Sequence, residues 1–143
     1  MKLNKKIIYC IISLLSVILI TTIFINKKFL NKDLHMPNLQ IKNNSEKINA
    51  FIYGYDYNKK TKYLTKYNDK NHSLTVAPSS EIKLEFIEVP HEYSIQIIDD
   101  STSIEINDYI FKSPEKKGSY IYSVNARWYD KGNIIYKFTI NIE

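Results

Sequence analysis

The sequence predicts an all-β domain, a single antiparallel β-sandwich that follows one N-terminal transmembrane helix. Two observations predict this class. From residue 48 onward apolar side chains recur with a period of two, which is typical of strands that bury one face. Before residue 26 an apolar run matches the length of a membrane-spanning helix. Seven or so short strands without helical periodicity outside that run favour two packed sheets.

The apolar run extends from Ile7 to Ile25, and Tyr9 and Cys10 are its only ionisable side chains. At about 1.5 Å per residue a helix of this length reaches roughly 28 Å, close to the hydrocarbon thickness of a bilayer. The end of the run carries no small-residue cleavage site, and bulky Tyr9 precedes Cys10 where a lipid-attachment signal has a small residue. We therefore expect an uncleaved and unlipidated anchor.

Lysines flank the run on both sides, so the charge bias for orientation is slight. Because a short basic segment precedes the run and over a hundred residues follow it, we expect the N-terminus in the cytoplasm and the C-terminal part outside the cell. The expected parts are a cytoplasmic tail, a single-pass anchor, a stalk and an extracytoplasmic domain, at residues 1–6, 7–25, 26–36 and 37–143.

Charge and cysteine content argue against a nucleic-acid-binding protein and against a disulfide-stabilised domain. Of the net charge of +5, three lysines precede the anchor, and residues 27–143 hold 17 basic and 15 acidic side chains, a balance of +2. Without a clustered basic patch, we expect no nucleic-acid partner. Cys10 is the only cysteine, so the outer domain has no disulfide and depends on strand pairing and aromatic burial.

The first strands are expected soon after the stalk. Residues 38–42 alternate after Pro37 and are predicted as an edge strand that ends at a turn of two asparagines. Residues 48–57 are predicted to be a strand with four aromatic rings on one face: Phe51, Tyr53, Tyr55 and Tyr57. Residues 58–71 are polar and lysine-rich, which predicts a long loop, with a short strand at 61–67 as an alternative.

Alternation also predicts two strands in the middle of the chain and a C-terminal hairpin. The first of these middle strands carries Ile82, Leu84 and Phe86 on one face. The second carries Tyr93, Ile95 and Ile97 on one face. In the hairpin, one strand places Tyr120, Tyr122, Val124, Ala126 and Trp128 on one face, and the closing strand does the same with Ile134, Tyr136, Phe138, Ile140 and Ile142. Asp130 to Asn133 supply turn chemistry between them.

The segment from Pro114 to Tyr122, PEKKGSYIY, followed by A-x-W, a glycine turn and Y-x-F, resembles the ending of immunoglobulin-like bacterial surface modules. Pro37 with Ile41, and Tyr53 with Tyr55, resemble the opening of small envelope domains of Gram-positive bacteria. The resemblance covers about residues 36–142 and implies an immunoglobulin-like sandwich. Tyr122 stands where antibody-type domains carry their second cysteine, two residues after a candidate tyrosine corner at Tyr120.

The sequence lacks the motifs of the common enzyme and cofactor sites. Only three glycines occur, so no phosphate-binding glycine loop is present, and no serine lies in a G-x-S-x-G motif. The three histidines are far apart, and Asp99, Asp100, Glu105 and Asp108 match no EF-hand spacing. We therefore expect no catalytic residue, no cofactor and no bound metal.

Three functions from different classes follow. The first is an envelope-facing binding or scaffold module for a protein, peptide or wall polymer, without catalytic activity. The second is inhibition of an extracytoplasmic enzyme such as a protease, since bacterial proteinase inhibitors with a similar strand ending are also immunoglobulin-like sandwiches. The third is an accessory subunit that binds another membrane protein through residues 7–25. A protease-inhibition assay separates the second from the first, and an unrelated replacement span separates the third.

The candidate binding residues are Tyr63, Lys66 and Tyr67. They lie in a stretch where tyrosines alternate with lysines, a combination that suits contact with anionic polymers or protein surfaces. The alternative is a solvated lysine loop beside rings that fill the core. Because Tyr63 and Tyr67 fall outside the predicted core pattern, we expect their rings to be available to a partner.

Overall fold

The computed structural model of the protein describes residues 13–18, 20–22, 35–44, 46–98, 104 and 106–143. The chain divides into two compact units, Met1–His35 and Met36–Glu143. In the first unit the described residues of the predicted anchor are helical, and the remainder of residues 7–25 lies outside the described part. No helix within the described ranges is long and apolar enough to cross a membrane.

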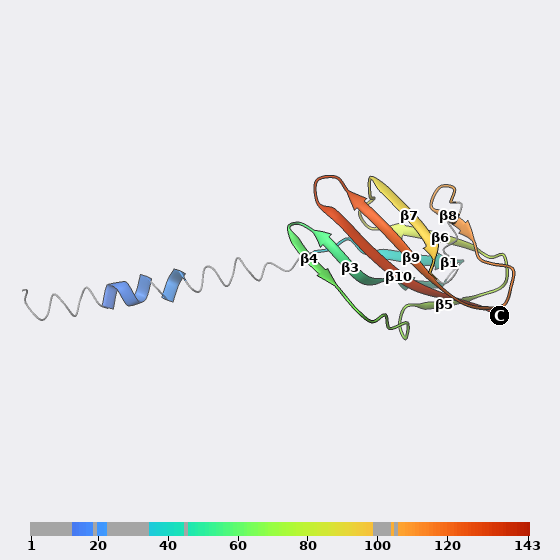
Figure 1. The fold of residues 1–143 in the computed structure, drawn as a ribbon, viewed down its shortest axis with the longest axis horizontal. Helices are drawn as coiled ribbons and strands as arrows, with labels where there is room; N and C mark the ends of the chain where they lie inside the picture. Colours follow the sequence, from blue (N-terminus) through green and yellow to red (C-terminus); the bar gives the residue numbers. More distant parts are fainter. Residues whose placement is uncertain (1–12, 19, 23–34, 45, 99–103, 105) are drawn as a thin grey trace, which may run out of the picture. The chain divides into compact units, whose positions relative to one another are not determined.

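The second unit is a sandwich of two antiparallel β-sheets, as the sequence predicts (Figure 1). One sheet has four strands in the order β2-β1-β6-β8, at Glu46–Asn49, Leu39–Asn43, Glu81–Phe86 and Ile110–Lys112. The other has six strands. Five follow the order β4-β3-β10-β9-β7, at Lys60–Tyr63, Phe51–Tyr57, Gly132–Ile142, Gly118–Trp128 and Glu92–Ile97.

The sixth strand, β5 at Ser73–Val76, pairs in parallel with the second half of β10. The first half of β10 pairs instead with β3, so the long last strand holds two neighbours on the same edge. On its other edge β10 pairs with β9 along its whole length, from Gly132 opposite Trp128 to Ile142 opposite Gly118. The predicted C-terminal hairpin is therefore the centre of the larger sheet.

Aromatic rings fill the space between the sheets. Trp128 is 1% exposed and meets Tyr57 edge-on, with 5.6 Å between ring centroids. Tyr122 stacks on Phe138 at 5.1 Å and also contacts Phe111 of the opposite sheet. These contacts confirm the predicted burial of Trp128, and the inward face of the hairpin is buried apart from Tyr120, which is half-buried. Rings this large dominate the burial energy of a small domain.

One polar contact joins the β10 core to the start of the domain. The Tyr136 hydroxyl donates a buried hydrogen bond of 2.8 Å to the carbonyl oxygen of Pro37, ninety-nine residues away. Burial raises the pKa of Tyr136 and that of Tyr122. The Tyr122 hydroxyl, unlike that of Tyr136, has no hydrogen-bond partner among the described residues, and neither does the indole N–H of Trp128.

Three details of the predicted strands are wrong. β1 is an inner strand, because β2 and β6 cover both of its edges. The predicted loop 58–71 contains β4, which begins at Lys60 and ends at Tyr63, earlier than the alternative strand at 61–67. The four aromatic rings of β3 do not share a face, because a bulge interrupts the pairing with β10.

The bulge changes the facing of β3. Ile135 of β10 pairs with Gly54, but Tyr136 pairs with Ile52, so that Tyr53 is an extra residue. Such a residue shifts the alternation of every side chain on one side of it. Tyr57 is consequently buried against Trp128, whereas Phe51 pairs with outward-facing Lys137. A pattern of period two in the sequence does not reveal this insertion.

The hairpin turn depends on Gly132. Residues 129–131 form the turn, which the Lys131 N–H closes on the Trp128 carbonyl. Gly132 has a φ of 110°, and a Cβ at this position would lie 2.1 Å from the carbonyl oxygen of Asp56. Glycine is required both by the dihedral angle and by the approach of β3.

Candidate functional site

The outer face of the four-stranded sheet is charged. Its outward side chains, which we call the charged face, are Gln40, Lys42, Lys47, Asn49, Glu81, Lys83, Glu85, Ile110 and Lys112. Glu85 forms ion pairs with Lys42 and, at 3.5 Å, with Lys83. The hydrogen bond from Lys42 lowers the pKa of Glu85. Paired Lys and Glu residues on a sheet surface are typical of a solvated face.

The outer face of the six-stranded sheet has a different composition. Its outward side chains include Tyr53, Tyr63, Ser94, Ser123, Asn125, Arg127, Asn133, Ile135 and Lys137, which we call the tyrosine-amide face, and they are bordered by Asp56, Glu92 and Gln96. Tyrosine and arginine are enriched in binding surfaces, and lysine and glutamate are depleted. Tyrosine combined with serine and asparagine is also the composition of antibody paratopes.

A shallow hollow lies in this face where β7, β9 and β10 run side by side. It encloses about 350 Å³ and is lined by Glu92, Tyr93, Ser94, Asn125, Arg127 and Asn133. Pairing aligns these residues in rows, since Asn125 is opposite both Ser94 and Ile135, and Arg127 is opposite both Glu92 and Asn133. Amide, hydroxyl, guanidinium and carboxylate groups thus converge on rigid strands, as ligand recognition requires.

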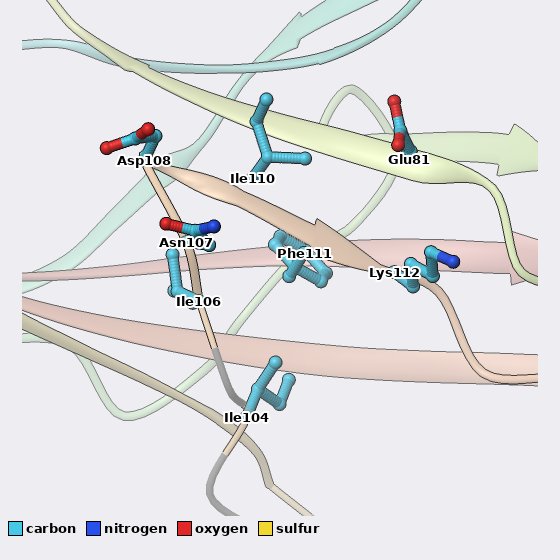
Figure 2. A pocket seen from close by; sticks show the side chains of 8 residues that line it. All are labelled: Glu81, Ile104, Ile106, Asn107, Asp108, Ile110, Phe111 and Lys112. Carbon is cyan, nitrogen blue, oxygen red and sulfur yellow. The ribbon is translucent and has the colours of Figure 1, made fainter.

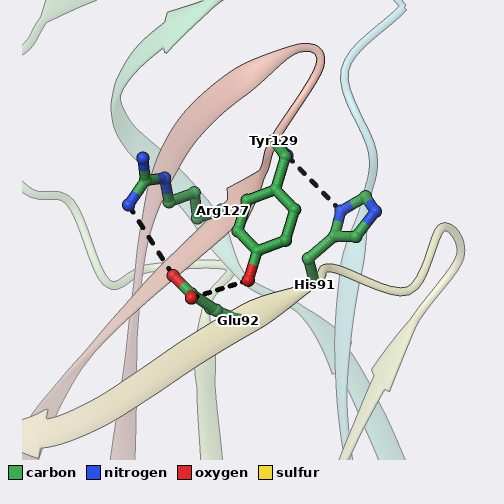
Figure 3. Close-up of polar contacts among 4 residues, drawn as sticks. All are labelled: His91, Glu92, Arg127 and Tyr129. Carbon is green, nitrogen blue, oxygen red and sulfur yellow. Dashed lines mark hydrogen bonds and ion pairs between the residues drawn. The ribbon is translucent and has the colours of Figure 1, made fainter.

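Tyr129 borders the hollow and is held in place although its ring is exposed (Figure 3). Its hydroxyl donates a 2.7 Å hydrogen bond to Glu92, which also pairs with Arg127 at 3.7 Å. Its ring stacks on His91 with 4.5 Å between centroids, and its backbone N–H donates to Nδ1 of His91. The hydrogen bond to Glu92 raises the pKa of Tyr129. The geometry fixes an aromatic ring beside polar groups before any ligand arrives.

Two further tyrosines lie on the same face. The Lys137 ammonium group lies 3.4 Å from the ring centre of Tyr53, which is a close cation–π contact. Tyr63 lies across Gly54, where a Cβ would come within 2.4 Å of Cδ1 of the ring. Gly54 therefore lets the Tyr63 ring lie flat on the sheet while more than half of its surface, 55%, stays exposed.

The predicted binding residues occupy different environments. Tyr63 and Lys66 are exposed, and Tyr67 is half-buried. The Tyr67 hydroxyl contacts the Thr139 hydroxyl at 3.1 Å and the His72 carbonyl at 3.3 Å, and its ring packs edge-on against Phe51. Burial raises the pKa of Tyr67. Tyr67 thus fastens the segment after β4 to the outer face of β10. Of the two predicted tyrosines, Tyr63 is the one whose ring stays exposed.

A second hollow of about 900 Å³ lies along β8 (Figure 2). Its described lining residues are Glu81, Ile104, Ile106, Asn107, Asp108, Ile110, Phe111 and Lys112. Isoleucine side chains and the charged groups of Glu81, Asp108 and Lys112 line it, and these described residues include no nucleophile next to a base. Asp99, Asp100 and Glu105 of the acidic segment lie outside the described residues. Within the described part of the chain, no three His, Cys, Asp or Glu side chains are grouped to hold a metal ion.

Sequence reasoning did not select Ser94, Asn125, Arg127, Asn133 and Tyr129 as site residues. Alternation in the segment 118–128 does put Asn125 and Arg127 opposite the buried face, so the sequence shows that these two side chains face outward. It does not show which residues of β7 and β10 lie beside them, because strand periodicity does not specify the pairing register.

The chain was compared with protein-family models, with curated proteins and with solved structures, and none of them matches it. The physical arrangement of the described residues is therefore the basis for any functional assignment.

Proposed function

We propose that the protein is a membrane-tethered, extracytoplasmic binding module with an immunoglobulin-like domain and no catalytic activity. The observation that carries the binding role is the contrast between the two outer sheet faces. One face is rich in lysine and glutamate, with Glu85 paired to two lysines, whereas the tyrosine-amide face presents rings, amides and hydroxyls around a hollow. Its partner is an envelope protein, a peptide or a wall polymer.

Strand order supports the immunoglobulin-like assignment. An immunoglobulin sandwich packs strands A, B and E against strands C, F and G. Here β1, β6 and β8 are neighbours in one sheet, and β7, β9 and β10 are neighbours in the other. Taken in chain order, these six strands correspond to A, B, C, E, F and G. The hairpin of β3 and β4 then extends the edge beyond G.

A tyrosine contact supports the same assignment. The Tyr120 hydroxyl donates a 2.8 Å hydrogen bond to the Lys116 carbonyl, four residues upstream, at the start of β9. A tyrosine near the start of strand F makes this kind of bond in immunoglobulin domains. Tyr122, two residues later, replaces the cysteine of antibody domains with a buried ring stacked on Phe138.

Features of the described helix support the membrane tether. Its five large apolar side chains are each more than half exposed, at Leu14, Leu15, Val17, Ile18 and Ile20. A helix that is apolar all round needs an apolar environment. Three of its polar side chains bond to its own backbone: Ser16 donates to the Ser13 carbonyl, Thr21 to the Val17 carbonyl and Thr22 to the Ile18 carbonyl. Internal satisfaction of polar groups suits lipid.

Cell fractionation tests the tether. The full chain should sediment with membranes and retain residues 1–26, and protease added to intact wall-stripped cells should digest the domain of residues 36–143. The control variant, with Ile7 to Ile25 replaced by an unrelated apolar span, should behave in the same way. A soluble form that begins near residue 23 or 27 would contradict the tether.

Crosslinking in the native envelope tests the binding role. We expect a defined partner to be recovered with the intact protein and with the replaced-span variant alike. Recovery that requires the native span would assign binding to the anchor, as in an accessory subunit. No partner with either protein would argue against a binding module.

A further inference from the structure

One end of the sandwich gathers exposed apolar side chains. We call it the loop end, and it comprises residues 36–38, 58–59, 87–91 and 129–131. In the second unit, the large apolar residues that are described as exposed are Tyr63, Ile87, Val89, Ile110 and Tyr129. Three of these five belong to the loop end, where Ile87, Val89 and Tyr129 are 66%, 62% and 63% exposed.

The loops at this end are fastened to one another. The Lys131 ammonium group bonds to Glu88 at 2.5 Å, and the Asn58 N–H donates to the Lys131 carbonyl. The His91 N–H donates to the Arg127 carbonyl, and the His91 ring stacks on Tyr129. Exposed apolar side chains on a preorganised support lose little conformational freedom when they become buried.

The chain also enters the domain at the loop end. The Ile87 N–H donates to the Asn38 carbonyl, and Leu39 is paired with Phe86 immediately before the exposed loop. The C-terminal residue of β10, Ile142, is paired at the far end of the same strands with Gly118 (Figure 1). A tether that precedes residue 36 is therefore attached to the domain at the loop end.

From these observations we infer that the loop end docks on the surface of a lipid bilayer, with Ile87, Val89 and Tyr129 entering the interfacial layer. The inference rests on the proposed membrane tether. Ten residues, 26–35, separate the predicted span from the second unit and reach at most about 36 Å when extended. The loop end is thus confined close to the membrane, and the short tether raises its effective concentration there.

The chemistry of the three side chains suits this layer. Tyrosine is enriched at membrane–water interfaces, and isoleucine and valine gain from the removal of apolar surface from water. Of the nearby charges, Glu88 pairs with Lys131 and Glu92 with Arg127, and the two other charged residues of the loop end, Lys59 and Asp130, are opposite in sign. The tyrosine-amide face lies along the strands, so the residues that line its hollow, which do not include Tyr129, stay available for the partner of the proposed function.

Depth-dependent fluorescence quenching tests the inference on the full chain in phospholipid vesicles. In a Cys10→Ser background, Asp130→Cys places one dye at the loop end, and Lys117→Cys places a control dye on the exposed segment before β9. Vesicles that contain spin-labelled lipid should quench the dye at 130 several-fold more strongly than the dye at 117. The double variant Ile87→Ser/Val89→Ser should remove most of this difference.

Each other outcome contradicts a specific step. Equal quenching at the two positions, or quenching at 130 that persists in the double variant, overturns the docking of the loop end. A signal at 130 that follows protein concentration instead of lipid quencher assigns these side chains to a second copy of the chain. A protein that does not float with the vesicles contradicts the tether itself, so the two failures are distinguishable.

Discussion

The two outer sheet faces of this sandwich share one core and differ in what they present to solvent. On the charged face Glu85 pairs with two lysines, which keeps a flat sheet surface soluble. On the tyrosine-amide face the same type of outward position carries rings, amides and hydroxyls, with Lys137 held over a tyrosine ring. Since the core constrains neither set of residues, this difference is the basis for the binding role that we propose for the second face.

The inner faces of the strands supply the stability of the domain. Changes on the inner face should therefore lower the free energy of unfolding, and changes of exposed side chains on either outer face should leave it nearly constant. The following predictions use this separation, beginning with the largest expected effect.

Truncation of Trp128 to Ala should have the largest effect. It removes the ring that packs on Tyr57 and leaves a cavity at the end of the core, so the free energy of unfolding should fall by about 3–5 kcal/mol. Chemical denaturation of the variant measures this loss. Trp128→Phe is the control, because it keeps a ring and removes an indole N–H that has no partner among the described residues. Equal losses in both variants would contradict the packing argument.

Removal of the two buried tyrosine hydroxyls should have different effects on the free energy of unfolding. Tyr136→Phe removes the hydrogen bond to the Pro37 carbonyl and leaves that oxygen buried, so it should cost about 1–3 kcal/mol. Tyr122→Phe removes a hydroxyl without a partner among the described residues, so it should be neutral or stabilising. Denaturation midpoints of the two variants compare them directly. A larger loss from Tyr122→Phe would place an undetected partner at that hydroxyl.

Alkaline pH should destabilise the domain through the same tyrosines. Burial raises the pKa of Tyr122 and of Tyr136 above the ordinary value of 10.0. Unfolded tyrosines lose their protons near that value while these two retain theirs, so stability is complete below pH 10 and is lost as the pH rises above it. Each group should contribute a slope of about 1.4 kcal/mol per pH unit. In denaturation series above pH 10, Tyr122→Phe should show a shallower slope than the unaltered chain.

Substitutions of the two predicted binding tyrosines should differ in their effect on the free energy of unfolding. Tyr67→Phe loses its contacts with Thr139 and His72, which should cost about 1 kcal/mol. Tyr63→Ser removes an exposed ring and should change the free energy of unfolding by less than about 0.5 kcal/mol. Thermal unfolding of both variants checks this order. Equal losses would assign Tyr63 to the structural framework as well.

The sequence was sufficient for the β-sandwich class and for the hairpin of β9 and β10, because strict alternation of apolar residues reports which face a strand buries. It was insufficient for β3, where one inserted residue at Tyr53 reverses the facing of Phe51. It was also insufficient for β1, whose neighbour β6 lies about forty residues further on and is chosen by tertiary packing.

The candidate site was harder to predict for a related reason. Composition drew attention to the tyrosines and lysines of residues 53–67, of which Tyr63 remains on the exposed face and Tyr67 is fastened by Thr139. The hollow instead combines residues from three strands, and their juxtaposition depends on register. A polar residue at an outward strand position has no distinguishing feature until its neighbours are known.

Recovery of crosslinked partner from the native envelope, with face-specific variants of the full chain, tests the central claim most directly. The triple variant Asn125→Ala/Arg127→Ala/Asn133→Ala alters the hollow, and Gln40→Ala/Lys42→Ala/Lys83→Ala is the matched control on the charged face. Both variants should keep the thermal unfolding midpoint. We predict that recovery falls roughly tenfold in the first variant only. Equal recovery from both variants, or a loss confined to the control, would contradict the assignment of binding to the tyrosine-amide face.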